Sequence, residues 1–376
     1  MANEVYDNSV ADVQATPVEP VVAGDFDLDR HAEYEAGLLE RCQRFWESDS
    51  GVLVYRRMRV DGVFTHGCGD MKRSLEMQLG ALQKGMEYEA DVPNFLEPWY
   101  GIGTLAGSFG AEYVWAEGQA PAVQPQFALV GEALEFDAVP VAQTTIGRHT
   151  LEMIDYFVEQ THGKLPLSFT DTQSPLNAAC GIVDMSGFFV DMLDEPEKTK
   201  EFLMRLGGLL VDFGHEQLRH VGERAVWPGH GFASCRCFDG LGMSDDDVLM
   251  ISGQQYLDFV APAVEFVGGR FGGPVFHSCG DWSSKVEMVR QIKGLRMVDG
   301  AFSSQTDPNP NRPEAFADAF AGTGIVVNAR IVGGPDTVVD MVKRLWRKGM
   351  KLIVVTYCQS PEEQAEAYER IHEVCL

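Results

Sequence analysis

The stretch GPVFHSCGDWSSKVEMVRQIKGLRMVDGAF, residues 273 to 302, decides the fold. It opens with a short apolar run that ends at His277 and Cys279, and it closes with a second apolar run at Leu295–Phe302. The segment between them has the spacing of an amphipathic helix, with Asp281 as its N-cap. Because both strands of such a strand–helix–strand unit run in the same direction, the stretch predicts a parallel sheet covered by helices.

The same alternation recurs along most of the chain. Counting such units after residue 160 gives about six, and one or two more can precede them. A closed eight-stranded barrel fits this count better than an open sheet. Neither GxGxxG nor a P-loop follows any predicted strand, which disfavours a nucleotide-binding doubly wound fold. The predicted strands are 164–171, 232–239, 273–280, 295–302, 324–331 and 351–358.

The expected class is therefore α/β, a (β/α)8 TIM barrel with an N-terminal helical extension. We expect one domain over residues 29–376. Residues 1–28 are polar and acidic and contain two prolines, so we expect a disordered acidic tail there. The helical extension begins at about residue 29, where apolar side chains recur with helical spacing.

Composition narrows the class of protein. The 376 residues carry a formal net charge of −26 and no evident basic face, which argues against nucleic acid or an anionic membrane surface as a partner. No run of eighteen apolar residues occurs, and the first thirty residues lack the apolar core of a signal peptide. The eight cysteines are too sparse for a disulfide framework. We therefore expect a cytoplasmic protein that does not enter a membrane.

Chemistry in such a barrel lies at the carboxyl ends of the strands. His277 and Cys279 are two residues apart on one predicted strand, so their side chains leave the same face. Cys358 ends the last predicted strand, on the same rim. One imidazole and two thiolates are the ligand set of a catalytic zinc with one open position, and thiolates favour zinc over magnesium or calcium. The alternative is that these thiols only pack in the core.

Two other thiol pairs compete for a metal role. His66 and Cys68 have the same spacing, but no third soft ligand is assigned to them, and a capped turn before a helix explains them more simply. Cys235 and Cys237 lie two apart on the predicted strand 232–239. Cys237 is a candidate spare ligand or substrate contact, with core packing as the alternative.

Further polar residues fall at predicted strand ends. Asp171 and Asp239 are candidate catalytic carboxylates, which act on substrate or accept the second N–H of His277, unless they only cap the following helices. Asn328 and Arg330 are candidate contacts for an anionic substrate group, with a buried ion pair as the alternative. Tyr100 either lines the pocket or packs a glycine-rich loop.

Several motifs resemble the uroporphyrinogen decarboxylase superfamily. They are FHSCGD (276–281), CFDGLGMSDDDVLMISGQQYLDFVAPAV (237–264), MSGFFVDMLDEPEKTKEFL (185–203) and the cysteine that ends the last strand. Within that superfamily the pattern is similar to the cobamide-dependent methyltransferase branch, which includes the methylcobamide:coenzyme M methyltransferases. The resemblance covers roughly residues 90–376.

That branch implies a (β/α)8 barrel with zinc held by His277, Cys279 and Cys358. It also implies a thiol, activated by the zinc, that attacks a methyl group on a corrinoid carried by a partner protein. The small-molecule methyl donor or acceptor stays open: coenzyme M, another thiol, a folate or a methylated donor.

The chain departs from the porphyrinogen decarboxylases at one place. Their RQAGR motif, which binds substrate carboxylates, is missing, and YRRMRVDG (55–62) stands near the expected position.

The second hypothesis is a metal-independent decarboxylase or lyase of the same superfamily that uses Asp171, Asp239 and nearby arginines. A third is a corrinoid or tetrapyrrole carrier, which the absence of an Asp-x-His-x-x-Gly pattern disfavours.

Overall fold

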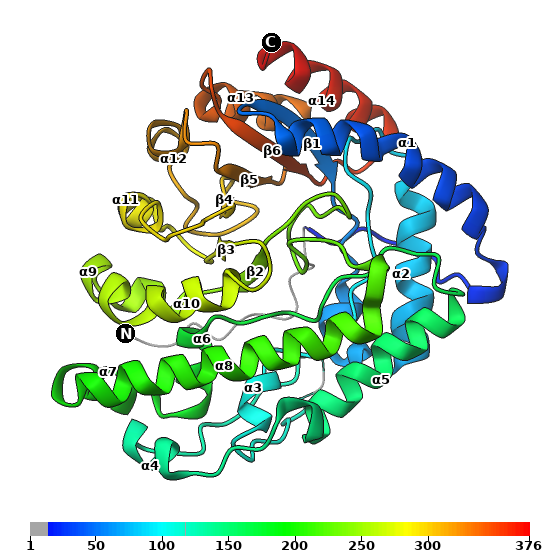
Figure 1. Cartoon of the computed structure of the whole chain (residues 1–376). Helices are drawn as coiled ribbons and strands as arrows, with labels where there is room; N and C mark the ends of the chain where they lie inside the picture. The colour runs from blue at the N-terminus through cyan, green and yellow to red at the C-terminus, as the bar shows by residue number, and fades with distance from the viewer. Residues whose placement is uncertain (1–13, 117) are drawn as a thin grey trace.

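A computed structural model describes residues 14–116 and 118–376 of the chain. Over these residues six strands form one parallel sheet in the order β1-β6-β5-β4-β3-β2 (Figure 1). The first strand therefore pairs with the last, as it does when a sheet curls back toward its own beginning. The strands are β1 (Gly51–Arg56), β2 (Leu241–Ser244), β3 (Pro274–His277), β4 (Met297–Ala301), β5 (Val326–Ile331) and β6 (Lys351–Thr356).

Helices follow the strands, and α10, α12, α13 and α14 lie along the outer side of the sheet in Figure 1. The strand–helix alternation predicted for the C-terminal part is confirmed. The helices of the described residues are α1 (Leu28–Glu47), α2 (Met71–Gly85), α3 (Thr104–Gly107), α4 (Val130–Glu135), α5 (Thr145–Gln160), α6 (Pro175–Ile182), α7 (Met185–Asp194), α8 (Pro196–Val221), α9 (Gly253–Gln255), α10 (Ala261–Gly268), α11 (Val286–Val289), α12 (Pro313–Phe320), α13 (Pro335–Leu345) and α14 (Pro361–Val374).

Two of the six predicted strands differ from the observed ones. The segment 164–171 is extended but makes only isolated parallel bridges, from Leu167 to Leu96 and to Ala225. The predicted strand 232–239 is wrong, because β2 begins only at Leu241. Gly240 has a φ of +98°, a conformation that favours glycine, so the chain turns there before it enters the sheet.

The strands bury both faces, and β6 shows how they divide the core. Leu352 and Val354 belong to the larger apolar cluster, which also contains residues of α13 and α14. Ile353 and Val355 belong to a second cluster on the opposite face of the sheet. Because side chains alternate along a strand, each position's parity decides which cluster it joins.

The N-terminal segment corrects one prediction. Residues 1–13 of the predicted tail lie outside the described residues. From Gln14 onward the chain packs on the domain, since Thr16 N donates to the Arg59 carbonyl at 2.8 Å and Val21 N donates to the Glu76 carbonyl at 2.9 Å. The helical extension is confirmed as α1, which Asp27 caps through the backbone N–H of Arg30.

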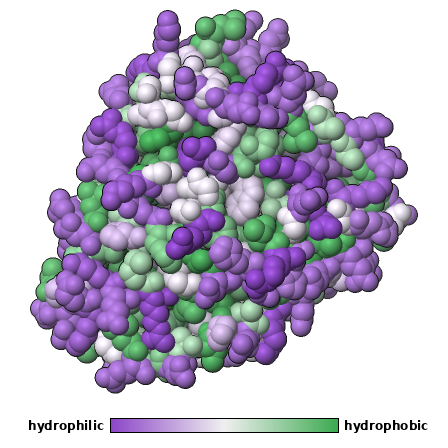
Figure 2. All heavy atoms as spheres, in the orientation of Figure 1, coloured by the Kyte–Doolittle hydropathy of each residue, from purple (hydrophilic) through white to green (hydrophobic). Residues whose placement is uncertain are grey.

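The surface is mixed in polarity. On the face in Figure 2, hydrophilic residues form most of the outline, and more hydrophobic residues gather toward the centre. Among the described residues, no helix is both long enough and apolar enough to cross a membrane.

Candidate metal centre

Strand register brings a row of polar side chains together across four neighbouring strands, at the carboxyl ends of β2 and β3. Ser244 of β2 pairs with His277 of β3, His277 pairs with Asp299 of β4, and Asp299 pairs with Asn328 of β5. Parallel strands in register place such partners side by side. The four residues therefore lie at one level of the sheet, although they are far apart in the sequence.

His277 is held by Asp299. Its Nδ1 lies 2.6 Å from Asp299 Oδ2, so Nδ1–H donates to the carboxylate and Nε2 faces the other way. Burial disfavours the charged imidazolium, but the hydrogen bonds to Asp299 and Cys279 outweigh it, and the pKa of His277 is raised well above its usual value. A carboxylate on one ring nitrogen is the usual device that orients a metal-binding histidine.

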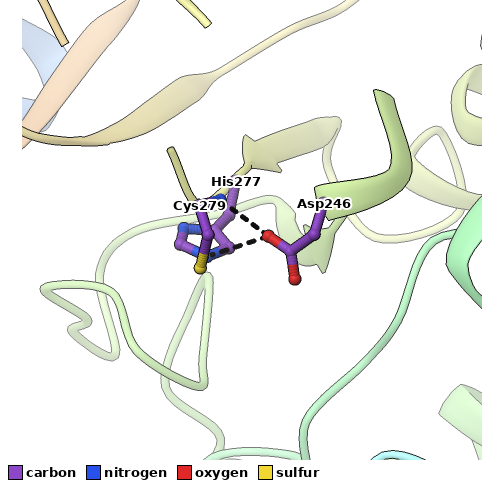
Figure 3. A group of neighbouring side chains, drawn as sticks. All are labelled: Asp246, His277 and Cys279. Atoms are coloured by element: carbon purple, nitrogen blue, oxygen red, sulfur yellow. Dashed lines mark hydrogen bonds and ion pairs between the residues drawn. The ribbon is translucent and has the colours of Figure 1, made fainter. Parts of the chain in front are cut away.

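Nε2 of His277 meets two further ligand atoms (Figure 3). Cys279 Sγ lies 3.5 Å from it, and an Asp246 carboxylate oxygen lies 3.7 Å from it. Zn–S and Zn–N bonds of about 2.3 and 2.0 Å at a tetrahedral angle put sulfur and nitrogen about 3.5 Å apart. One donor atom from each of the three residues fits within a mutual spacing of 4.8 Å. The donor types and their spacing fit zinc.

Asp246 was missed in the sequence. It begins the short 3-10 helix Asp246–Met250 that follows β2, and its Oδ1 accepts the backbone N–H of Cys279 at 2.6 Å. In the sequence it is one of three consecutive aspartates, which read as the acidic first turn of a helix. Only the adjacency of β2 and β3 shows which of the three faces the histidine.

Asp299 organises the buried side of the centre. It is 1% exposed and accepts hydrogen bonds from His277, from Arg330 Nε at 2.9 Å and from the side-chain amide of Asn328. Burial raises the pKa of Asp299, but Arg330, His277 and Asn328 together lower it to about 2. Asn328 and Arg330 therefore bond to Asp299, with the buried ion pair that was their alternative role, and Arg330 also lines the cavity beside the centre.

A cavity of about 230 Å³ opens beside the centre and is strongly cationic. Its lining includes His277, Cys279 and three arginines, namely Arg57, Arg59 and Arg330. Nη2 of Arg57 and Nη2 of Arg330 are buried and have no hydrogen-bond acceptor among the described residues. The Arg57 Nη2 reaches Glu97 only at 3.9 Å. A cavity lined by three arginines suits a carboxylate, sulfonate or phosphate group.

His230 also lines the cavity. Its Nδ1 is 2.6 Å from Glu97 Oε2, and its Nε2 is 3.3 Å from Asp171 Oδ2. Burial raises the pKa of Glu97, but His230 and Arg57 lower it below its usual value. Asp171 therefore contacts His230, whereas Asp299 is the residue that orients His277. His230 lies in a Gly-His-Gly turn outside any strand, so strand-end reasoning did not reach it.

Cys358 is not brought to the centre. It is 1% exposed, and it packs in the larger apolar cluster with Leu352 and Val354. Its carbonyl accepts Arg56 Nε at 2.9 Å. Cys358 has the same parity as the helix-facing residues of β6, and Tyr357 takes the opposite side. Cys358 was expected on the same rim as His277, but it follows the end of β6 and packs on the helix-facing side of the sheet.

Three other predicted site residues also lie elsewhere. Tyr100 stacks on His149 of α5, with 3.8 Å between ring centroids. Asp239 forms an ion pair with Arg296 at 2.7 Å. Cys237 and Asp239 precede the first residue of β2, so they lie at the amino ends of the strands, whereas His277 lies at a carboxyl end. The strand that was predicted to end at these two residues does not exist.

The second His-x-Cys pair lies in the 3-10 helix His66–Gly69. Cys68 is fully buried and is outside the metal-binding group of the described residues. Burial raises the pKa of the Cys68 thiol to about 12.

Comparison with known proteins gives a similarity of fold. No family model and no curated protein sequence matches the chain. Among solved structures, the fold is similar to a "methyltransferase from Methanosarcina mazei", with a TM-score of 0.62 and 14% identity. The similarity covers 89% of this chain and 98% of that one. At this identity the likeness concerns the fold.

Proposed function

We propose that the chain is a zinc-dependent methyltransferase that moves a methyl group between a corrinoid, carried by a partner protein, and a small anionic thiol. The observation that carries the proposal is the meeting of His277 Nε2, Cys279 Sγ and an Asp246 oxygen within 4.8 Å. The cationic cavity beside them and the fold shared with a methyltransferase support it.

His277, Cys279 and Asp246 would hold the metal. When bound, zinc lowers the pKa of a coordinated thiol and so supplies a thiolate nucleophile at neutral pH. Asp299 fixes the ring of His277 by accepting Nδ1–H, so that Nε2 points toward Cys279. Cys358 is the alternative third ligand; a metal measurement on its alanine variant separates the two.

The arginines would bind the other end of the substrate. Nη2 of Arg57 and Nη2 of Arg330 can each donate to an anionic group of the thiol substrate. Such a contact orients the sulfur and lowers the entropic cost of the reaction. The expected small molecule is therefore a thiol with a carboxylate, sulfonate or phosphate at its far end.

The sheet, in this proposal, closes into a (β/α)8 barrel. The parallel bridges of Leu167 to Leu96 and to Ala225, and of Gln173 to Ser244, support this closure. These extended segments would fill the gap between β1 and β2.

Methyl transfer can be measured directly. Methylcobalamin serves as a stand-in donor, and 2-mercaptoethanesulfonate as the thiol, with the methyl thioether quantified by mass spectrometry. We expect methylation that a chelator abolishes and that Cys279→Ser removes. Cys375→Ser, at the end of α14, is the matched control and should leave the rate unchanged. Equal rates with and without the protein would overturn the proposal.

A metal-independent lyase is the second candidate. The arginines that line the cavity favour it, because a carboxylated substrate would fit them equally well. His230 and Asp171 would then be the acid–base pair. Turnover of a carboxylated tetrapyrrole that persists in the presence of a chelator would support this reading over methyl transfer.

A further inference from the structure

A second group of cysteines lies at the amino ends of the strands. Cys42 is on α1, and Cys235 and Cys237 are on the turn before β2. Lys351, the first residue of β6, donates to the carbonyl of Trp46 near the end of α1, which places that helix at the amino ends of the strands. His277, by contrast, is the last residue of β3. This cluster is therefore separate from the candidate metal centre.

Two of the three sulfur atoms are in contact. Cys235 Sγ and Cys237 Sγ lie 3.1 Å apart. Cys42 also approaches the Asp91 carbonyl at 3.2 Å. Cys42 and Cys235 are fully buried, while Cys237 is partly exposed. Only Cys237 is therefore open to a reagent from solvent.

The backbone brings the two sulfurs together. Phe238 N donates to the Cys235 carbonyl at 3.3 Å, which closes a tight turn over Cys235–Phe238. A turn brings residues two apart closer than a strand does, and a disulfide needs Cα atoms roughly 4.4–6.8 Å apart.

Contacts on both sides hold this turn against α1. Arg236, between the two cysteines, forms hydrogen bonds of 2.6 and 3.2 Å with Glu35 of α1. Phe238 stacks on Trp46 with 4.5 Å between ring centroids. The two sulfurs therefore stay next to each other in the folded protein.

The two neighbouring thiols have unequal acidity. The contact with Cys235 favours the thiolate of Cys237 and lowers its pKa below the usual value. The contact with Cys237 and burial raise the pKa of Cys235. The accessible sulfur is therefore the more acidic of the two.

We propose that Cys237 and Cys235 form a redox-active dithiol that exchanges with low-molecular-weight disulfides. The Cys237 thiolate attacks one sulfur of the disulfide, forms a mixed disulfide and releases one thiolate. Cys235 then attacks the Cys237 sulfur and displaces the second thiolate, which takes up the proton that Cys235 loses. The protein gains one disulfide, and one small disulfide is reduced to two thiols. This inference does not rest on the proposed methyl transfer.

The geometry favours a dithiol over a second metal site. Sulfurs in a tetrahedral zinc site lie about 3.7 Å apart, since each Zn–S bond is about 2.3 Å. The observed Sγ–Sγ distance of 3.1 Å lies between that spacing and the roughly 2.0 Å of an S–S bond. A disulfide across one residue closes a very small ring, so we expect it to be readily reducible.

The test treats the full chain with 2-hydroxyethyl disulfide and maps its peptides without reduction. Trypsin cuts after Arg236, so it separates Cys235 from Cys237 unless a disulfide joins them. We expect the wild type to give the linked peptide pair, and a reductant to release it. Failure to find that pair, or a stable mixed disulfide on Cys237 of the wild type, would overturn the proposal.

Serine variants assign the order of events. Cys235→Ser should trap one mixed disulfide on Cys237, because the second attack is blocked. Cys237→Ser should leave Cys235 unmodified, and Cys375→Ser should react as the wild type does. A linked peptide between Cys42 and Cys237 in the wild type, or a metal ion that Cys42→Ser releases, would refute the assignment.

Discussion

The change Asp299→Asn tests whether this buried carboxylate organises the metal centre. The substitution keeps the shape of the side chain but removes the charge that faces His277 Nδ1 at 2.6 Å and Arg330 Nε at 2.9 Å. The pKa of Asp299 is lowered to about 2, and a shift of about two units from 3.8 corresponds to roughly 2–3 kcal/mol of net interaction. Loss of one partner from a buried ion pair typically costs about 3–5 kcal/mol. We therefore expect the free energy of unfolding to fall by about 2–4 kcal/mol.

The same variant should weaken metal binding by about 10- to 100-fold, because the ring of His277 is no longer held. Denaturant unfolding and chelator competition measure the two effects. Asp239→Asn is the matched control, since Asp239 also pairs with an arginine, at 2.7 Å, but is half exposed. We expect the control to lose less than about 1 kcal/mol and no metal affinity. Equal effects of the two substitutions would refute the role of Asp299.

Three further predictions follow from the same geometry. Cys358→Ala should keep its metal and lose roughly 1–2 kcal/mol of unfolding free energy, because the thiol packs in the core; loss of metal by this variant would make Cys358 a ligand. Arg57→Gln should raise the KM for an anionic thiol by about 10- to 100-fold and leave that of a neutral thiol unchanged; equal shifts for both thiols would contradict an anion contact. Burial and Arg236 lower the pKa of His31 from 6.5 to about 4. Between these two pH values the folded state binds fewer protons than the unfolded state, so the free energy of unfolding decreases as the pH is lowered. Between pH 8 and 5 the wild type should lose about 2 kcal/mol that His31→Phe does not lose, measured by denaturant unfolding at both pH values; identical losses would contradict the buried neutral imidazole.

The sequence was sufficient for the parts that depend on local pattern. The apolar runs around 273–302 predicted β3 and β4, which needs no knowledge of the neighbouring strands. The two residues that the sequence grouped, His277 and Cys279, have Nε2 and Sγ 3.5 Å apart, although β3 ends at His277 and Cys279 follows it.

The remainder depends on register and on strand ends. Cys358 was predicted to end a strand and to face the centre. Side chains alternate between the two faces of the sheet, and Cys358 falls on the helix-facing side with Leu352 and Val354. The segment 232–239 has an apolar pattern, yet the turn at Gly240 ends it before the sheet begins. Asp246 begins a short 3-10 helix and His230 lies in a turn, and only the folded chain shows that they reach His277 and Asp171.

The metal content of the purified protein is the most direct test of the central claim. Elemental analysis of the wild type should find about one zinc per chain. Asp246→Asn and Cys279→Ser should each lose most of it, because both remove a donor from the group around His277 Nε2. Well-folded wild-type protein that binds no zinc, even when zinc is supplied during purification, would contradict the account.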